Sequence, residues 1–214
     1  MELKKIAVLD DYDQSISKLA CWKKLDSFFL ITFFDRKVMP YELSDFHIIV
    51  ANSERIILDS HFLSSLTKLE HVALTGRLSG QADLEFLKQR NITVSYTDGS
   101  GSSAAEQTMA LLLGITKRIH LGHIQIKNGG WQQGLNHTLH GKTLGVLGLG
   151  RVGTKVAQFG KVLDMNVISW GPTPDNGRSL KLGIERVALD ECLSRSDVLC
   201  LCLRLSDEKR ELLK

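Results

Sequence analysis

The sequence of 214 residues contains no hydrophobic run long enough to cross a bilayer. A secretory signal is also missing, since the apolar run in MELKKIAVLDDYD is very short and meets two aspartates at once. Lysine and arginine occur in ones and twos, and the formal net charge is only +3. We therefore expect neither a membrane nor a nucleic acid as a partner.

Cysteine is scarce, with four residues in the whole chain. Cys200 and Cys202 alternate with leucines in VLCLCL and would face one side of a strand, but no further Cys or His at a matching spacing completes a metal site. Free cysteines usually pack as small hydrophobic side chains. We therefore predict buried, reduced thiols, no metal, and the reducing cytoplasm as the location.

The seven histidines offer no better metal site or general base. Two pairs, His120 with His123 and His137 with His140, have an i, i+3 spacing, yet no carboxylate or cysteine nearby completes a set of ligands. Contacts with solvent on a helix surface or in a loop explain these pairs more simply. We assign no histidine a catalytic role.

The chain does contain a regular alternation of apolar runs and helical stripes. Hydrophobic residues make up 43% of it, enough for the core of one or two domains. Runs typical of buried parallel strands occur in KKIAVLDD near the N-terminus and at 46–54, 71–76 and 91–96. Residues 59–69, between two of these runs, have the apolar spacing of a helix. This order predicts an α/β fold with parallel sheets built from βαβ units.

A Gly/Ser cluster, DGSGSS at 98–103, interrupts this alternation and predicts a domain junction. Ser103 and Glu106 then have the spacing of a capping box at the start of a helix. We expect this helix to run for about six turns, to the Asn-Gly-Gly stop at 128–130. Its apolar positions are Met109, Leu112, Leu113, Ile115, Ile119 and Ile126.

The most specific motif is LGVLGLGRVG at 144–153, in which Gly148, Gly150 and Gly153 have the G-x-G-x-x-G spacing. In a dinucleotide-binding fold the first glycine allows a tight turn, the second lets the backbone approach a diphosphate, and the third lets helix and strand pack closely. The context agrees, because the apolar segment TLGVL precedes the motif and an amphipathic helix opens at Arg151. The alternative is a tight strand–helix turn that binds nothing.

The segment after the motif continues the alternation, with strands predicted at 165–170 and 197–203. The helix between them and the motif has its apolar positions at Val152, Val156, Phe159, Val162 and Leu163. An acid that would hold the ribose hydroxyls is expected at the end of the next strand, but Trp170-Gly171-Pro172 stands there. The choice between NAD and NADP is therefore open. Arg178 and Lys181 follow, and would either meet a phosphate or be solvated surface charges.

Three segments together resemble the D-isomer-specific 2-hydroxyacid dehydrogenases, a family that includes phosphoglycerate, glyoxylate and formate dehydrogenases. They are SSAAEQTMALLLGITKRI at 102–119, GGWQ at 129–132 and GKTLGVLGLGRVGTKVAQFGKVLDMNVI at 141–168. The resemblance implies a flavodoxin-like substrate-binding lobe over 1–99 and a Rossmann dinucleotide-binding lobe over 100–214. It also implies an NAD(P)-dependent oxidoreductase that transfers hydride between nicotinamide and C2 of a small D-2-hydroxy or 2-keto acid.

The same resemblance implies which residues form the sites. The cofactor-binding positions would be Gly148, Leu149, Gly150, Arg151, Val152, Gly153, Thr108, Trp170, Gly171, Cys202 and Leu203. Thr75, Gly76 and Arg77 would form the loop whose backbone amides hold the substrate carboxylate. Relatives are commonly dimers, so a homodimer through 102–140 is expected.

The sequence departs from the family pattern at several positions. Ser53 stands where relatives often carry an arginine that contacts an anionic substrate, while Cys202 and Arg204 stand where the family favours His and Pro. No segment matches the family's catalytic arginine, acid and histidine, so we assign no catalytic residue. We therefore expect a C-terminally truncated member, with both lobes incomplete, that is inactive alone. The alternatives are a non-catalytic dinucleotide-binding protein, of the corepressor or scaffold kind, and a truncated product without function.

Overall fold

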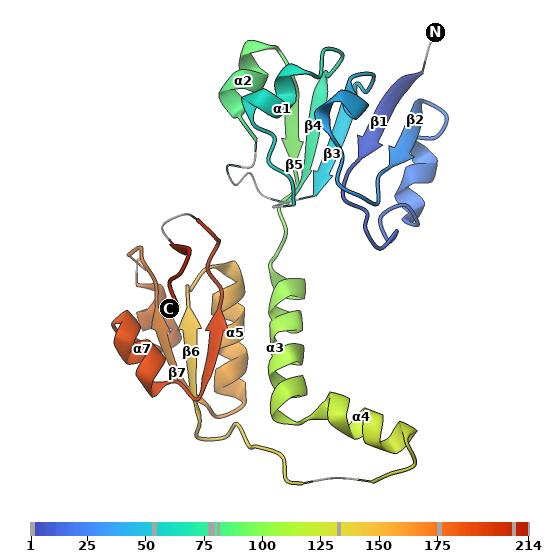
Figure 1. The fold of residues 1–214 in the computed structure, drawn as a ribbon. Coiled ribbons are helices and arrows are strands. Elements are labelled where there is room, and N and C mark those ends of the chain that lie inside the picture. Colours follow the sequence, from blue (N-terminus) through green and yellow to red (C-terminus); the bar gives the residue numbers. More distant parts are fainter. Residues whose placement is uncertain are drawn as a thin grey trace. The chain divides into compact units, whose positions relative to one another are not determined.

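The computed structural model describes residues 3–52, 55–76, 80, 82–131, 134–174, 177–206 and 209–213. The chain divides into two compact units, Met1–Gly99 (unit 1) and Ser100–Lys214 (unit 2), and the boundary falls inside the Gly/Ser cluster. Each unit contains its own parallel sheet with helices (Figure 1). The predicted α/β fold with parallel sheets is confirmed.

Unit 1 contains a five-stranded parallel sheet in the order β2-β1-β3-β4-β5. The strands are β1 Lys4–Val8, β2 Phe29–Phe33, β3 Ile48–Asn52, β4 His71–Thr75 and β5 Thr93–Tyr96. One face of the sheet is fully buried through residues such as Ile49, Val72 and Leu74. Strand β2 was not predicted, because it lies at the edge of the sheet and none of its residues is fully buried.

The helices of unit 1 are short. They are η1 Ala20–Lys24, η2 Pro40–Leu43, α1 Ser60–Ser64 and α2 Leu84–Gln89. The helix predicted over 59–69 therefore ends five residues early, although Leu66 and Leu69 are still buried in the turns that follow α1. The Asp59 carboxylate caps α1 by accepting a hydrogen bond from the Phe62 amide at 2.7 Å.

Unit 2 contains a four-stranded parallel sheet in the order β8-β7-β6-β9. Its strands are β6 Thr143–Leu147, β7 Asn166–Trp170, β8 Glu185–Arg186 and β9 Val198–Leu201. Helices α5 Arg151–Val162, α6 Arg178–Leu182 and α7 Leu189–Arg195 connect them. The strands predicted around the glycine motif and the helix opening at Arg151 are confirmed.

The long helix predicted after the Gly/Ser cluster is two helices, α3 Ser102–Thr116 and α4 Ile119–Lys127. The chain turns at Arg118, whose φ of 52° lies in the left-handed region, and α4 points away from α3 (Figure 1). The predicted capping box is also wrong. Gly101, with a φ of 72°, is the N-cap residue, so the helix begins one residue before Ser103 and no side chain caps it.

Helix α5 packs against the sheet through its small residues. Gly153, Val156, Ala157 and Gly160 are buried, whereas Phe159 and Val162 of the predicted apolar stripe are exposed. A Cβ atom at Gly160 would lie 2.5 Å from Leu144 Cδ2, so the helix approaches β6 more closely than larger side chains permit. The predicted stripe is therefore correct at Val156, which is buried, and at Val152 and Leu163, which pack against the core, and wrong at Phe159 and Val162.

Candidate functional site

The glycine motif lies at the point where β6 ends and α5 begins. Strand β6 is paired with β7 on one side and β9 on the other, although β9 follows β7 by nearly thirty residues in the sequence. The chain passes from β6 through α5 to β7 on one side, and later from β8 through α7 to β9 on the other side of β6, so the strand order reverses at β6 and a crevice opens there at the carboxyl ends of the strands. This is the position at which open α/β sheets bind ligands.

Gly148 makes the tight turn that ends β6. Its φ is +98°, and a Cβ atom there would lie 2.7 Å from Leu203 Cδ2. Its amide donates a hydrogen bond to the Trp170 carbonyl at 2.7 Å, which holds the turn against the end of β7. The glycine is required by backbone conformation and by the approach of a neighbouring loop.

The two other glycines differ from Gly148 and from each other. Gly150 is the N-cap residue of α5 with an ordinary extended backbone, and a Cβ atom there would meet no protein atom within 4 Å. At Gly153 a Cβ atom would lie 1.9 Å from the Gly148 carbonyl oxygen. Gly153 thus serves helix–strand packing, while Gly150 keeps open the space in front of the first turn of α5. A dinucleotide diphosphate fits this arrangement, because that turn presents amide groups and the positive end of the helix dipole.

A cleft of about 300 Å³ adjoins the loop. It is lined by the glycine loop at 148–150, by 169–173 at the end of β7, and by 202–204 after β9, with Arg178, Arg186 and Lys209. Arginine or lysine supplies every charged side chain of this lining, within the part of the chain that the structure describes. The cleft therefore suits an anionic ligand.

Two of the arginines are anchored to the cleft by backbone carbonyl groups. Arg178 Nη1 donates to the Leu149 carbonyl at 2.9 Å, inside the glycine loop. Arg186 Nη2 donates to the carbonyl oxygens of Gly171 and Thr173, each at 2.8 Å, in the loop after β7. Both guanidinium groups are thereby fixed beside the loops that form the cleft.

Cys202 forms part of the opposite wall, after β9. Its amide donates to the Leu147 carbonyl at 2.9 Å, which extends the pairing of β9 with β6 to the edge of the cleft. Burial, and to a smaller extent the neighbouring Cys200, raises the pKa of the Cys202 thiol to about 11. The thiol is therefore protonated and unreactive at neutral pH.

Comparison with known proteins agrees with this site. Residues 109–214 match the family model "D-isomer specific 2-hydroxyacid dehydrogenase, NAD binding domain". The chain is 31% identical over 167 residues to a D-3-phosphoglycerate dehydrogenase of Archaeoglobus fulgidus and 32% identical over 166 residues to a glyoxylate reductase of Aeropyrum pernix. A phosphoglycerate oxidoreductase from Vibrio cholerae superimposes with a TM-score of 0.86 at 32% identity, covering 98% of this chain and 70% of that one.

The chain belongs to the D-isomer specific 2-hydroxyacid dehydrogenase family. The matched part of unit 2 is the NAD-binding domain of this family, and NAD is the cofactor of that domain. The aligned regions are 77% and 73% of this chain, but the chain covers only 32% of the archaeal D-3-phosphoglycerate dehydrogenase and 50% of the glyoxylate reductase.

Most of the cofactor positions implied by family resemblance lie together. Gly148, Leu149, Gly150, Trp170, Gly171, Cys202 and Leu203 line the cleft. Arg151 lies beside Gly150 in an adjoining hollow on the α5 side, while Val152 packs into the core between α5 and the sheet. Thr108 is not among the residues that line the cleft. Its hydroxyl donates instead to the Ala104 carbonyl at 2.8 Å within α3.

The predicted substrate loop lies at the end of β4 in unit 1. Thr75 donates a hydrogen bond from its hydroxyl to Asn52 Oδ1 at 3.0 Å. The Gly76 amide, expected to hold a carboxylate, donates to the Thr97 hydroxyl at 2.7 Å. Arg77 and Ser53 lie outside the described residues.

The sequence analysis did not predict three cationic residues of the cleft, Arg186, Arg204 and Lys209. They lie far from the glycine motif in sequence and reach the cleft because β8 and β9 run parallel to β6 and β7, so that all four strands end on the same side of the sheet. Arg178 and Lys181 follow the motif as candidate phosphate ligands or, more simply, as solvated surface charges; Arg178 lines the cleft, whereas Lys181 does not. No motif could have separated these two residues, since both belong to the short helix α6.

No described helix combines the length and the apolar character needed to cross a membrane. Across the same described ranges, no three His, Cys, Asp or Glu side chains gather in a way that could hold a metal ion.

Proposed function

We propose that this chain is the dinucleotide-binding and part of the substrate-binding region of an oxidoreductase. The enzyme would transfer hydride between nicotinamide and C2 of a small D-2-hydroxy or 2-keto acid. The observation that carries the proposal is the division of labour among the three glycines, in which only Gly150 faces open space at the first turn of α5. The names of relatives, a phosphoglycerate dehydrogenase and a glyoxylate reductase, support this substrate class.

Each residue of the predicted cofactor and substrate sites then has a role. The glycine loop and the first turn of α5 would hold the diphosphate, with Arg151 and Val152 supplying backbone amides. Trp170 and Gly171 would flank the adenosine ribose, and Cys202 and Leu203 would close the cleft on the β9 side. Thr108 would approach the nicotinamide side, and Thr75, Gly76 and Arg77 would hold the substrate carboxylate. The bound nicotinamide supplies the hydride chemistry, while these residues orient it and exclude water.

Titration of the 214-residue chain with NADH tests the cofactor site, with binding followed by calorimetry. Gly150→Ala places a methyl group in the space assigned to the diphosphate while keeping an allowed backbone, so we expect at least about tenfold weaker binding with little change in Tm. Gly114→Ala is the matched control, because its Cβ would also meet nothing within 4 Å but lies in the last turn of α3, away from the cleft lining. Equal NADH affinity of the two variants would contradict the site.

We expect the 214-residue chain to have no dehydrogenase activity of its own. No segment of the sequence matches the family's catalytic arginine, acid and histidine, so we expect the 214-residue chain to bind NADH without oxidising it. Absorbance at the NADH band with glyoxylate or hydroxypyruvate measures this. Turnover at the rate of an ordinary enzyme would show that residues within 1–214 do the chemistry. Failure of a longer gene product to turn over any 2-keto acid, together with retained binding, would favour the non-catalytic alternative.

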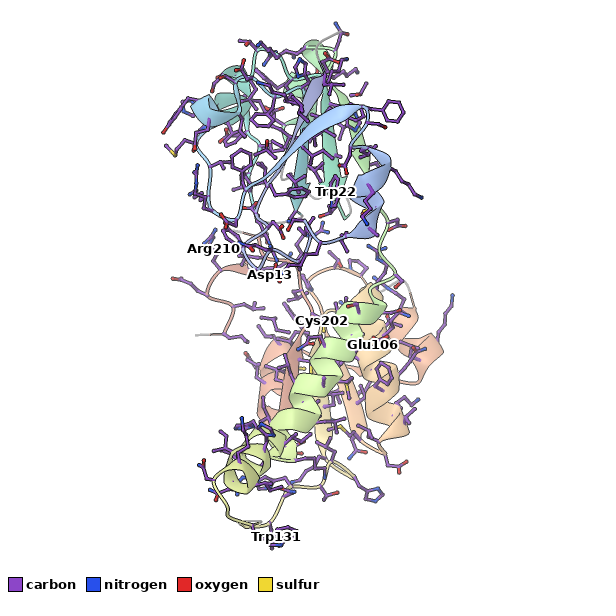
Figure 2. All side chains as sticks on the ribbon, turned by 90° about the vertical axis from the view of Figure 1, so that its right-hand side faces the viewer. Asp13, Trp22, Glu106, Trp131, Cys202 and Arg210 are labelled. Atoms are coloured by element: carbon purple, nitrogen blue, oxygen red, sulfur yellow. The ribbon has the colours of Figure 1, made fainter. Side chains whose placement is uncertain are left out.

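We further infer a homodimer formed through 102–140. Helix α4 has no buried residue, and apolar side chains of this segment are strongly exposed, including Ile115, Ile119, Ile126 and Trp131. Trp131 lies beyond the end of α4, away from the sheet of unit 2 (Figure 2). Several exposed large apolar side chains within one segment are typical of an interface. Light scattering after gel filtration should give twice the monomer mass for the native chain and for Leu180→Glu, and the monomer mass for Ile119→Glu.

A cytoplasmic location belongs to the same proposal, because all four cysteines are free thiols. Fractionation of source cells with an antibody to the chain tests it, and recovery from a secreted fraction would refute it.

A further inference from the structure

Strand β2 forms one edge of the unit 1 sheet, and the described part of the chain places no further strand beside it (Figure 1). The Phe34 amide donates to the Val8 carbonyl at 2.9 Å, so the backbone groups of every second residue before Phe34 also face β1. Those of Ile31 and Phe33 face outward, and no backbone hydrogen bond is formed on that side of either residue within the described ranges. Unpaired groups of this kind are a template for another strand.

The strand itself carries no charge or proline that would keep another strand away. Residues 28–34 read FFLITFF, and aromatic and β-branched residues of this kind favour the extended chain. The Phe28 and Leu30 side chains are 64% and 49% exposed. Edge strands of natural proteins usually carry a lysine, a proline or a bulge that prevents pairing with another chain. This edge is therefore open to a second strand of suitable sequence.

The segment FFLITFF reads nearly the same in both directions about Ile31. Antiparallel pairing with a second copy, with the two-fold axis at Ile31, would place these residues opposite each other: Phe28 and Phe34, Phe29 and Phe33, Leu30 and Thr32. Aromatic pairs across two strands stabilise a sheet. The backbone agrees with this axis, because a residue paired with its own copy exchanges both hydrogen bonds, and the groups of Ile31 face outward. The edge is thus self-complementary.

The charges that flank the segment are complementary about the same axis. Asp26 and Arg36 stand at equal distances in sequence on either side of Ile31. The acid of one copy would therefore lie at the end of the strand pair where the other copy has its arginine. Asp26 is exposed, and the Arg36 side chain is 58% exposed and also pairs with Glu42 of its own copy. Opposite charges at both ends favour this orientation of the two strands.

We propose that β2 is a self-association site, at which it pairs antiparallel with β2 of a second copy of this chain. The site lies in unit 1 and is separate from the contact proposed for residues 102–140. A pair of five-residue strands offers little surface compared with a stable dimer interface, so the contact forms at high protein concentration and dissociates at the dilution of gel filtration. The proposal does not depend on the dinucleotide function.

The test uses paired substitutions at Leu30 and Thr32, which are exposed and would face each other across the axis. Leu30→Lys with Thr32→Lys sets lysine opposite lysine twice, whereas Leu30→Lys with Thr32→Glu sets lysine opposite glutamate twice. Both are made together with Ile119→Glu, which removes the contact proposed for 102–140. Sedimentation measures the average mass from about 10 µM to about 1 mM, the range in which a weak contact forms.

We expect the mass of Ile119→Glu to rise from monomer toward dimer over this range. The lysine–lysine variant should associate at least about tenfold more weakly, and the lysine–glutamate variant should retain association. Hydrogen exchange of the Ile31 and Phe33 amides should slow with concentration only in the proteins that associate. If Ile119→Glu does not fold, the same substitutions in the native chain are compared, and the rise is from dimer to tetramer.

A mass that stays constant up to about 1 mM, with unchanged exchange at Ile31, would overturn the proposal. Association of the lysine–lysine variant as strong as that of its parent would place the contact outside β2. Equal loss in the two paired variants, with equal Tm, would exclude the two-fold axis at Ile31 and with it the proposed pairing.

Discussion

The carboxyl ends of the strands differ between the two parallel sheets: hydrogen-bonded side chains form this edge in unit 1, and a glycine loop forms it in unit 2. In unit 1 this edge consists of side chains that bind one another: Asn52 accepts from Thr75, the Thr97 hydroxyl accepts from the Gly76 amide, and Arg55 donates to the Asp10 carbonyl. In unit 2 the glycine loop ends the central strand, and its backbone adjoins a cleft lined by cationic side chains. The same strand arrangement thus supports a nearly self-satisfied polar edge in one unit and a surface shaped for a ligand in the other.

The two edges should therefore differ in how much stability a single substitution costs. An edge made of side-chain hydrogen bonds loses one bond at a time, and each is worth about 1 kcal/mol. An edge made of glycines at close approach has no side chain that can yield, because backbone contacts backbone. We therefore expect substitution of the closely packed glycines of unit 2, such as Gly153, to cost far more stability than polar substitutions in unit 1.

The largest effect is expected from Gly153→Ala. The new Cβ atom would lie 1.9 Å from the Gly148 carbonyl oxygen, so α5 must move away from β6. Overpacking of this kind costs about 3 kcal/mol or more, which lowers Tm by about 6 °C or more. Thermal unfolding followed by circular dichroism measures it, with Gly114→Ala as the control expected to keep or raise Tm. An unchanged Tm for Gly153→Ala would contradict the close approach of α5.

A smaller effect is expected from Asn52→Ala in unit 1. The Asn52 side chain donates to the Leu9 carbonyl at 3.0 Å and accepts from Thr75, linking the ends of three strands. Its loss leaves the carbonyl of the buried Leu9 without this bond and should cost about 2 kcal/mol. Gln14→Ala, which removes an exposed bond to Asp35, should leave the urea midpoint unchanged. A cost for Asn52→Ala equal to that of Gly153→Ala would erase the contrast between the edges.

A carboxylate at the amino ends of the unit 2 strands makes the stability of this unit depend on pH. The Asp197 carboxylate accepts from the Thr143 amide at 2.8 Å and from Lys142 at 3.0 Å. The backbone bond, followed by the lysine, lowers the pKa of Asp197 below its ordinary 3.8. The stabilisation is therefore complete above pH 3.8 and is lost as the pH falls through the lowered pKa.

Replacement by asparagine keeps an acceptor and removes only this charge. We expect Asp197→Asn to have a modestly lower Tm than the native chain at pH 7, with the gap constant down to about pH 5 and closing below pH 3.8. Melting curves of both proteins over this range measure the gap. A gap that widens on acidification would reverse the sign of the linkage.

The smallest change is expected at Cys202. Because burial raises the pKa of this thiol to about 11, iodoacetamide at pH 7.5 should modify the exposed Cys21 and leave Cys202 almost untouched. Peptide mass spectrometry gives the extent at each site, and bound NADH should slow the residual reaction at Cys202 further, since this residue lines the cleft. Equal modification of the two cysteines would place Cys202 outside the cleft wall.

Much of the fold was predictable because buried parallel strands are continuous apolar runs. Strands β1, β3, β4, β6 and β7 all show this pattern and were predicted. Strand β2 was missed because an edge strand need not be apolar throughout, and α2 was missed because six residues give too short a period. The break at Arg118 carries no glycine or proline signal, since an ordinary residue adopts the left-handed conformation there.

Some residues of the candidate site were predictable from the sequence, and others were not. The glycine loop and the ends of β7 and β9 were predictable because their residues belong to a contiguous motif or end a predicted strand. The arginines of the cleft were not, because Arg178 and Arg186 reach it through hydrogen bonds to carbonyls of distant loops. Sequence patterns report local spacing, whereas such contacts exist only once the sheet has formed.

The pairing of β6 with β9 also has a consequence for how unit 2 folds. The bond between Thr143 and Asp197 joins residues 54 positions apart, and the intervening chain contains α5, β7, α6, β8 and α7. Contacts at such separation form late, because the entropy of closing the loop must be lost before the strands pair. Cys202 and Leu203 reach the cleft only through this pairing, so a partly folded unit 2 lacks one wall of its cleft. Bound ligand should therefore lower the unfolding rate of unit 2. The same ligand added during refolding should leave the folding rate of unit 2 unchanged.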